Sequence, residues 1–242
     1  MNDTWRRFEE ALARRAPVFW WRDDDAAAPS AELERLLALS AAASVPLALA
    51  VVPQAADPAL FTILHNETAL LQHGTDHRNR AAPGEKKTEF PAAEAEDAAL
   101  ARIAAGRERL ERLAGSRALP VLAPPWNRLR AALVPRLLEA GIHGLSAYGE
   151  RASAEPAPGL TQVNTHVDIV AWRTGRGFIG EEQALALALR QLEENTGEPT
   201  GWLTHHAVHD RAAWSFLERL FDISRRHGAQ WARAQALFGP SR

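Results

Sequence analysis

Short apolar segments alternate with helix-forming segments along most of this 242-residue chain. Six apolar runs have the length of buried strands, at residues 18–21, 47–52, 119–123, 142–146, 160–163 and 202–204. Five other segments carry apolar residues at helical spacing, at residues 33–40, 100–113, 133–138, 185–192 and 214–224. This alternation predicts a parallel sheet covered by helices, either a barrel or an open doubly wound sheet. Because the chain has no internal repeat and no low-complexity linker, we expect a single domain over residues 1–242.

Several of the expected helices have recognisable ends. Ser30 stands where a helix N-cap is expected, since its side-chain oxygen can accept a hydrogen bond from a free backbone N–H. Gly115 and Gly141 follow the second and third helices, and Gly228 follows the last. Glycine is common at such positions because it adopts a left-handed backbone without strain.

The composition excludes several functions. The 28 basic and 30 acidic residues nearly balance, which gives no electrostatic basis for binding nucleic acid or an anionic membrane. The chain has no cysteine, so any metal must bind to His, Asp or Glu. Glycine-rich nucleotide loops and the G-x-S-x-G elbow of serine hydrolases are also absent from the sequence. No apolar run reaches membrane-spanning length and the N-terminus lacks an apolar signal region, which predicts a cytoplasmic protein.

Three consecutive carboxylates, Asp23, Asp24 and Asp25, follow the first apolar run. Charges at the end of a buried strand cost free energy unless other groups pair with them. The carboxyl ends of parallel strands are also where α/β proteins build active sites. Since side chains alternate along a strand, at least one of the three should point into the top of the fold. The alternative is a solvated loop or a helix N-cap cluster.

Two pairs of histidines have a spacing suited to metal binding. His73 and His77 are four residues apart, which on a helix places both imidazoles on one face, where they can bind one divalent ion. The alternative is an exposed polar helix with two unliganded histidines. His205 and His209 have the same spacing and are a rival pair. We rank this pair second because His205 would end the last strand and His209 would lie in the following loop or helix.

The loop after residues 119–123 begins with Pro124 and Pro125, which fix a rigid and extended exit from the strand. It would display Trp126, Asn127 and Arg128, and tryptophan is a common stacking surface for sugars. The alternative is a structural loop whose tryptophan packs on the rim of the fold.

His205 and Asp168 are candidates for proton transfer. His205 ends the last apolar run, and histidine can act as a general acid near neutral pH. An aspartate such as Asp168 can orient a catalytic histidine and raise its pKa. The alternative for Asp168 is a surface turn.

In this order, the segments resemble the five motifs of the polysaccharide deacetylase superfamily, carbohydrate esterase family 4, also called the NodB-homology domain. The resemblance covers about residues 17–228. The family motifs Thr-Phe-Asp-Asp-Gly, His-(Ser/Thr)-x-x-His, Arg-Pro-Pro-x-Gly, Asp-x-x-x-Trp and Leu-x-His are matched, in part or in full, by residues 22–26, 73–77, 123–127, 168–172 and 203–205. The resemblance implies a distorted (β/α)7 barrel, similar to a TIM barrel with one unit missing.

The resemblance also implies roles for individual residues. Asp25, His73 and His77 would bind a divalent ion, Zn²⁺ in the first place, with Co²⁺, Ni²⁺ or Mn²⁺ as alternatives. Asp24 would be the catalytic base, although an alignment shifted by one residue would give the base and ligand roles to Asp23 and Asp24. His205 would protonate the leaving amine, with Asp168 holding its charge. The expected substrate-binding residues are Trp126, Asn127, Arg128, Trp172 and Leu203, of which Trp172 and Leu203 would line the acyl pocket.

One departure from the family pattern concerns the catalytic base. The arginine that steadies this base in the family is replaced by Ala123, and either Arg22 or Arg128 would have to take its place. We therefore expect a divergent member, a metal-dependent hydrolase that removes an acetyl group from an N-acetylated sugar or polysaccharide by cleaving a non-peptide carbon–nitrogen bond. The alternatives are a hydrolase of a small amide or ester, and a deacetylase-like module that binds glycans without turnover. The sequence does not predict the oligomeric state.

Overall fold

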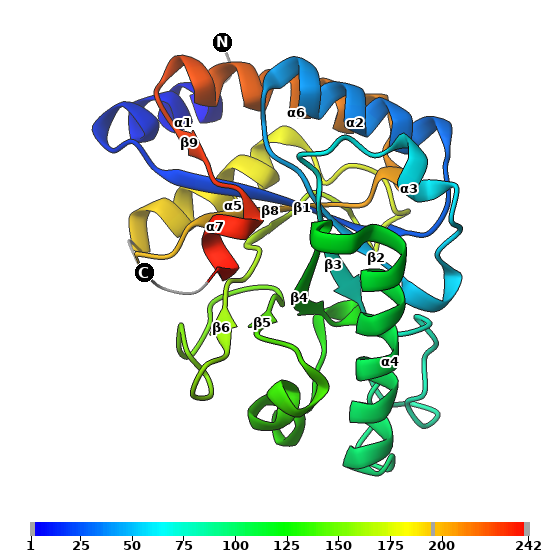
Figure 1. Ribbon diagram of the computed structural model, residues 1–242. Coiled ribbons are helices and arrows are strands. Elements are labelled where there is room, and N and C mark those ends of the chain that lie inside the picture. Colours follow the sequence, from blue (N-terminus) through cyan, green and yellow to red (C-terminus); the bar gives the residue numbers. More distant parts are fainter. Residues whose placement is uncertain (1–2, 195–196, 240–242) are drawn as a thin grey trace.

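The structure is a computed structural model that describes residues 3–194 and 197–239. Within this part of the chain, nine parallel strands form one sheet, which curls into part of a barrel (Figure 1). Their spatial order is β6-β5-β4-β3-β2-β1-β8-β7, and β9 pairs with the start of β1. The strands are β1 (Val18–Ala26), β2 (Ala48–Val51), β3 (Ala69–His73), β4 (Ala118–Ala123), β5 (Gly144–Leu145), β6 (Thr161–Gln162), β7 (Val167–Asp168), β8 (Thr200–Thr204) and β9 (Gln230–Trp231).

The helices form the outer layer of the fold. The α-helices are α1 (Asp3–Arg14), α2 (Ala31–Ala43), α3 (Leu60–Ile63), α4 (Glu96–Ala114), α5 (Glu181–Glu194), α6 (Arg211–Arg226) and α7 (Ala234–Phe238). Short 3-10 helices are η1 (Pro53–Ala55), η2 (Gly115–Arg117), η3 (Pro125–Asn127), η4 (Ala131–Ala140) and η5 (His206–Val208). Figure 1 shows α1, α2 and α6 side by side over one face of the sheet, and α4 beside the strands at its other end. None of the helices described here combines the length and apolar character needed to span a bilayer.

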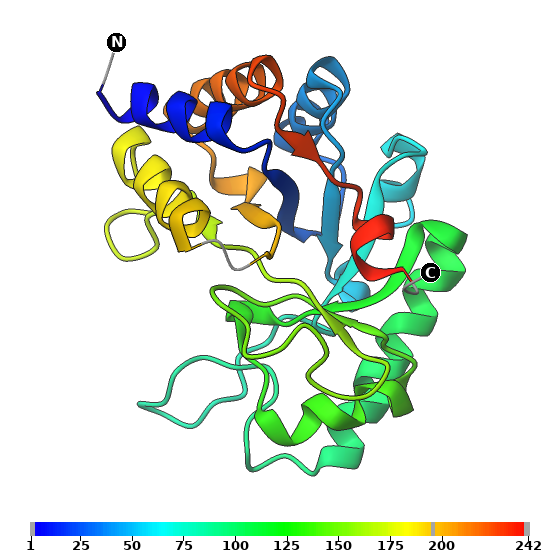
Figure 2. The same ribbon diagram turned by 90° about the vertical axis from the view of Figure 1, so that its left-hand side faces the viewer.

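The inner face of the sheet carries mostly alanines and other apolar residues, together with one large side chain, that of Trp20. Alanines and other apolar side chains of β2, β3 and β4 form this inner core together with Trp20 of β1. The ring of Trp20 packs edge-on against Phe238 of α7, which follows β9 and lies against the sheet (Figure 2). Because strand side chains alternate, Arg22 and Asp24 continue the face of Trp20 towards the carboxyl end of β1.

The other face of β1 packs against helices. Phe19 and Trp21 belong to the largest apolar core, and the ring of Trp21 lies 4.9 Å from that of Phe221 on α6. Asp23 is on this same outer face and is fully buried. The first strand therefore divides its charged residues between the barrel interior and the helical layer.

The predicted parallel sheet with helical cover is confirmed, and so are most of the helix limits. Ser30 accepts a hydrogen bond from the Leu33 N–H as N-cap of α2, and α4 ends at Gly115. Residues 133–138 lie in the 3-10 helix η4, which contains Pro135, and not in the expected α-helix. The sequence analysis missed α1, the short strands β7 and β9, and β3, whose five residues include the polar Gln72 and His73.

Candidate active site

The end of β1 contains a bulge that brings two neighbouring carboxylates to the same place. Adjacent residues of a regular strand face opposite sides of the sheet. The pairing of β1 with β2 shifts register between Asp23 and Ala26, and Asp25 has a φ of 72°. Aspartate tolerates this left-handed backbone better than most residues do. Because of it, the Asp25 side chain does not point to the opposite face from Asp24, as it would in a regular strand. Asp24 and Asp25 therefore both reach the top of the barrel.

Asp25, His73 and His77 bring their donor atoms together at this end of the sheet. The Oδ1 atom of Asp25 lies 3.0 Å from His73 Nε2 and 3.2 Å from His77 Nε2. Among the described residues, this is the only group of three His, Asp or Glu side chains whose donor atoms all lie within 4.8 Å of one another. The expected helix for the two histidines is wrong, because His73 ends β3 and His77 lies in the loop after it. The two rings converge because the chain turns at Gly74, which has a φ of 60°.

The surroundings of this triad suit a divalent cation. The Nδ1 atom of His73 lies 2.9 Å from the backbone oxygen of Ala123. A proton on Nδ1 that is donated to this oxygen leaves the Nε2 lone pair facing Asp25 and His77, which is how metal-binding histidines are usually oriented. Two imidazole nitrogens and one carboxylate oxygen are a donor set for Zn²⁺, Co²⁺, Ni²⁺ or Mn²⁺ that leaves coordination positions open.

A buried carboxylate, Glu89, holds the loop between the two histidines. Its Oε1 accepts hydrogen bonds from the Thr75 N–H at 2.9 Å and from the Asp76 N–H at 3.2 Å. Arg102 of α4 lies 3.2 Å from the same oxygen, so the charge of Glu89 is paired. Glu89 lies twelve residues after His77, and no motif connects the two in the sequence.

Replacing Gly74 with alanine is expected to distort this loop. A Cβ atom at this position would lie 2.0 Å from Glu89 Oε2 and 2.5 Å from a ring carbon of Pro125, and alanine would also have to adopt a φ of 60°. We expect Gly74→Ala to lower the free energy of unfolding by about 1–3 kcal/mol and to weaken metal binding. Urea denaturation and Zn²⁺ titration measure the two effects. Gly84→Ala, in the neighbouring loop with open space around it, is the control for a left-handed glycine outside the triad.

Asp24 is paired with Arg22 inside the barrel. Arg22 Nη2 donates to Asp24 Oδ2 at 3.0 Å, and Arg22 Nε lies 2.8 Å from Asp24 Oδ1. Both side chains are almost completely buried. Arg22 also donates to Asn127 Oδ1 at 2.7 Å and to the Ser146 backbone oxygen at 2.9 Å. Arg128, the other arginine considered for this place, points elsewhere and donates to the Lys87 backbone oxygen.

The proline-containing loop after β4 approaches the triad from one side. Trp126 and Asn127 both have a left-handed backbone, with φ values of 55° and 54°. The Trp126 ring lies 4.6 Å from that of His77, while Asn127 is tied to Arg22. Backbone strain of this kind is concentrated at functional sites.

His205 and Asp168 lie on the opposite side of Asp24 from this loop. His205 Nε2 is 3.9 Å from Asp24 Oδ2, and the His205 ring packs edge-on against Trp172 at 4.6 Å. Asp168 accepts hydrogen bonds from Trp172 Nε1 at 2.7 Å and from the Val170 N–H. Burial raises the pKa of Asp168, while the charge of His205 and the Trp172 hydrogen bond oppose that rise. Leu203 is fully buried and pairs in register with both Arg22 and Asp168.

The rival pair of His205 and His209 does not converge. The short helix η5 separates the two residues, and the His209 ring packs edge-on against Trp214 of α6 at 4.7 Å. Burial lowers the pKa of His209 to about 4, with neighbouring histidines adding to the effect. His209 therefore belongs to the helical layer.

Solved structures share this architecture over nearly the whole chain. They include a peptidoglycan N-acetylglucosamine deacetylase at 16% identity and a TM-score of 0.61, covering 95% of this chain and 91% of that chain. The family 4 carbohydrate esterase from Streptomyces lividans matches at 15% identity and a TM-score of 0.58, covering 88% and 91%. The Streptococcus mutans CE4 esterase matches at 11% identity and a TM-score of 0.61, covering 94% and 90%. The fold is that of the carbohydrate esterase family 4 deacetylases. The predicted distorted barrel is thereby confirmed, although neither a family model nor a curated protein matches the sequence itself.

Compared with the motif pattern of the family that the sequence resembles, the arginine beside Asp24 comes from another strand. Ala123, at the end of β4, occupies the place of the motif arginine, and its side chain belongs to the inner core. Arg22 stands two residues before Asp24 on β1, so the two side chains lie on the same face of the strand, and Arg22 pairs with the Asp24 carboxylate there. Strand periodicity could have indicated this contact, but the sequence analysis ended the strand at residue 21.

Asp23 is the carboxylate for which the sequence offered no role. Its Oδ2 accepts hydrogen bonds from Thr204 Oγ1 at 2.6 Å and from the His206 N–H at 2.9 Å, and its Oδ1 lies 2.5 Å from His206 Nδ1. Burial favours protonation of Asp23, but His206 and Thr204 outweigh this effect and lower the pKa. Since Asp23 lies on the outer face of β1, the alignment shifted by one residue, which would place it beside Asp24 at the metal, does not fit the geometry.

Proposed function

We propose that this protein is a metal-dependent hydrolase that removes an acetyl group from an N-acetylated sugar or polysaccharide. The observation that carries this proposal is the convergence of the Asp25–His73–His77 triad with the Asp24–Arg22 pair and His205. These groups stand at the carboxyl ends of β1, β3 and β8, where α/β barrels have their active sites. Solved structures with the same fold are named as deacetylases and carbohydrate esterases.

We assign complementary roles to the residues around the triad. A divalent ion bound by Asp25, His73 and His77, with Zn²⁺ as the first candidate, would polarise the acyl carbonyl and acidify a water molecule. Asp24, held in one orientation by Arg22, would accept the proton of the attacking water. His205 would give a proton to the departing amine, so that the carbon–nitrogen bond breaks and acetate and a free amine leave. Asp168, which is close enough to influence His205 through charge, would stabilise the protonated ring.

The substrate would enter beside Trp172. A cleft of about 470 Å³ adjoins the site and is lined by residues that include Tyr148, Asp168, Trp172 and Arg173. Trp172 and Tyr148 expose 43% and 41% of their surfaces there, although most of the eight tryptophans are buried. Exposed aromatic faces with polar neighbours suit a sugar ring, which has both apolar and hydroxyl-bearing surfaces. We place Trp172 and Leu203 at the acyl group, and Trp126 and Asn127 on the opposite wall. Arg128, also expected to bind substrate, donates to the Lys87 backbone oxygen instead and is not placed there.

The site bears differently on the two alternative functions. A glycan-binding module without turnover was favoured by the missing motif arginine, and the presence of Arg22 beside Asp24 weighs against it. A small-molecule amidase or esterase would share the same centre and differ only in its substrate.

Acetate release by the metal-loaded protein tests the proposal. The substrates are N-acetylglucosamine, its oligomers, peptidoglycan fragments, and small N-acetyl amides and acetyl esters. We expect release from the N-acetylated sugars, and loss of turnover with retained metal in Asp24→Asn. Release from small amides or esters alone would favour the alternative hydrolase, and glycan binding without any release would favour the non-catalytic module.

A further inference from the structure

The backbone that carries His205 is fixed on both sides by the same buried carboxylate. Thr204 precedes His205 and donates its hydroxyl hydrogen to Asp23 Oδ2 at 2.6 Å. His206 follows His205 and donates its backbone N–H to the same oxygen at 2.9 Å, while its ring Nδ1 lies 2.5 Å from Asp23 Oδ1. The Asp23 carboxylate is therefore bonded to the residue on each side of His205.

This arrangement is closed off from solvent. Asp23 and Thr204 have no exposed surface, and His206 exposes 4% of its surface. Trp21 extends the arrangement by donating its Nε1–H to Thr204 Oγ1 at 2.8 Å. A hydrogen bond in such a low-dielectric environment fixes the positions of its partners more firmly than one in water.

Stability alone gives no reason for a carboxylate at this position. Asp23 shares the outer face of β1 with Phe19 and Trp21, which pack in the largest apolar core. A buried charged pair at such a place is often no more stabilising than an apolar side chain of similar size, because both groups lose their hydration. What the pair does provide is one defined geometry for the residues bound to it.

We propose that Asp23 and His206 are positioning residues that hold the 204–206 segment so that His205 faces Asp24. The proposal rests on the proposed function, in which His205 donates a proton to the leaving group. With the segment fixed, the His205 ring keeps its edge-on contact with Trp172 and its Nε2 stays 3.9 Å from Asp24 Oδ2. Asp23 fixes this segment on both sides of His205, while Trp21 holds the Thr204 hydroxyl and η5 continues the chain.

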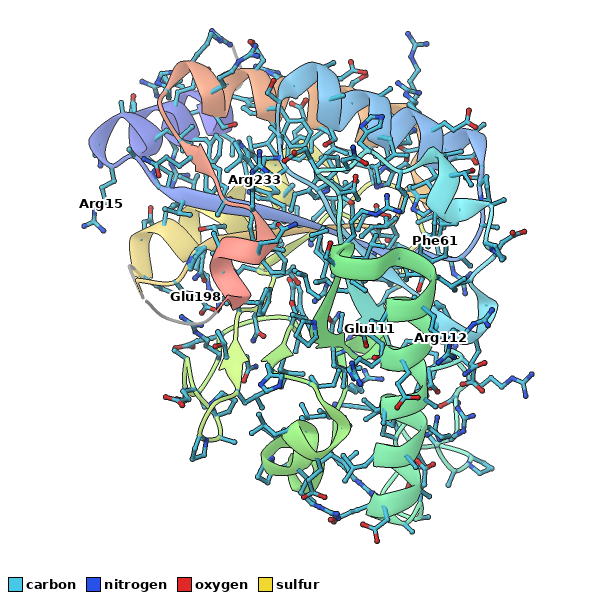
Figure 3. The ribbon with its side chains drawn as sticks, viewed as in Figure 1. Arg15, Phe61, Glu111, Arg112, Glu198 and Arg233 are labelled. Atoms are coloured by element: carbon cyan, nitrogen blue, oxygen red, sulfur yellow. The ribbon has the colours of Figure 1, made fainter. Side chains whose placement is uncertain are left out.

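Substitutions of His206 separate positioning from general stability. His206→Leu replaces the ring with an apolar side chain and removes the ring bond to Asp23, while His206→Asn can place an amide N–H near the position of Nδ1. Glu198→Gln is the control, since Glu198 is also a buried carboxylate beside a histidine, His166 at 3.4 Å. It lies just before the start of β8, at the other end of the strand from His205, and is labelled in Figure 3.

Steady-state kinetics and histidine NMR provide independent measurements. We expect His206→Leu to lower kcat about 10–100-fold with KM within about threefold of wild type, because misplaced proton donors mainly affect the chemical step. Metal content should stay at the wild-type level, and His206→Asn should recover most of kcat. In ¹H–¹⁵N spectra of the imidazole rings, assigned with His205→Gln, the His205 signals should shift or broaden in His206→Leu and return in His206→Asn.

The NMR measurement does not depend on the reaction. If wild type releases no acetate from any substrate, the proposed function fails while the His205 signals still test the positioning. The positioning is overturned if the His205 signals and kcat of His206→Leu match wild type. It is equally overturned if Glu198→Gln causes the same loss of kcat, or if His206→Asn recovers neither measurement.

Discussion

Asp25→Asn is expected to abolish tight binding of a divalent ion. The Asp25 carboxylate is the only charged member of the triad when both histidines are neutral, and it lies within 3.2 Å of both rings. Asparagine tolerates the φ of 72° at this position, whereas alanine would add backbone strain to the effect under study. We expect the affinity for Zn²⁺ or Co²⁺ to fall by more than about 100-fold. Loss of a residue that only orients a metal ligand typically lowers the affinity by about 10–100-fold, and Asp25 would be a ligand itself. Metal analysis after dialysis and calorimetric titration measure this loss.

Two companion variants complete this experiment. His73→Ala should also bind no metal, although removal of its buried ring should lower stability more than Asp25→Asn does. Asp222→Asn, which changes an exposed ion pair with Arg226 on α6, should retain one ion per chain. Absence of a stoichiometric ion in wild type, after purification with added Zn²⁺ or Co²⁺, would contradict the triad as a metal site.

Arg22→Met is expected to cause a large loss of both activity and stability. It leaves the Asp24 carboxylate buried without its partner, and breaking a buried ion pair on one side typically costs about 3–5 kcal/mol. Turnover should fall by about 100-fold or more, because the proposed base loses its orientation. Arg22→Lys should recover little. The planar guanidinium of Arg22 donates to Asp24, Asn127 and Ser146 at once, which a lysine ammonium cannot do. Urea denaturation and kcat are the measurements.

Arg128→Met is the matched control for Arg22→Met. Arg128 donates to the Lys87 backbone oxygen near the surface, so its loss should cost less than about 1 kcal/mol and change kcat by only a few-fold. A rescue experiment uses Arg22→Thr together with Ala123→Arg, which restores the arginine position expected from the family resemblance. Partial recovery of kcat relative to Arg22→Thr is the expected result. If Arg128→Met were the more damaging variant, Arg22 would not be the partner of the proposed base.

Periodicity and motif order were sufficient for the fold and for the three residues whose donor atoms converge, Asp25, His73 and His77. The alternation of strands and helices predicted the parallel sheet, and the order of the motifs predicted the deacetylase barrel. The spacing of His73 and His77 was misread as helical, because a strand followed by a tight turn can bring residues four apart to one point just as a helix does. The local sequence could not distinguish the two, since β3 contains only a short apolar run before Gln72.

The contacts that hold the site together join residues far apart in the sequence, and they depend on strand register. Asp23 meets Thr204 only because β1 and β8 pair in register, since the two residues are 181 positions apart in the sequence. Glu89 reaches the turn at Gly74 from a loop that carries no recognisable motif. Arg22 was within reach of sequence reasoning, but charged residues were taken to end the strand when they in fact continue it to Ala26.

The placement of Arg22 on β1 affects how such proteins can be recognised. The proposed base and its partner are encoded two residues apart, so a single short stretch of sequence carries both, and the end of β4 needs only a small residue at position 123. A search pattern that requires Arg-Pro-Pro would pass over this arrangement. An Arg-x-Asp-Asp stretch followed by Ala-Pro-Pro would find it, and chains that share both features are expected to supply the arginine beside the carboxylate from the first strand, as here.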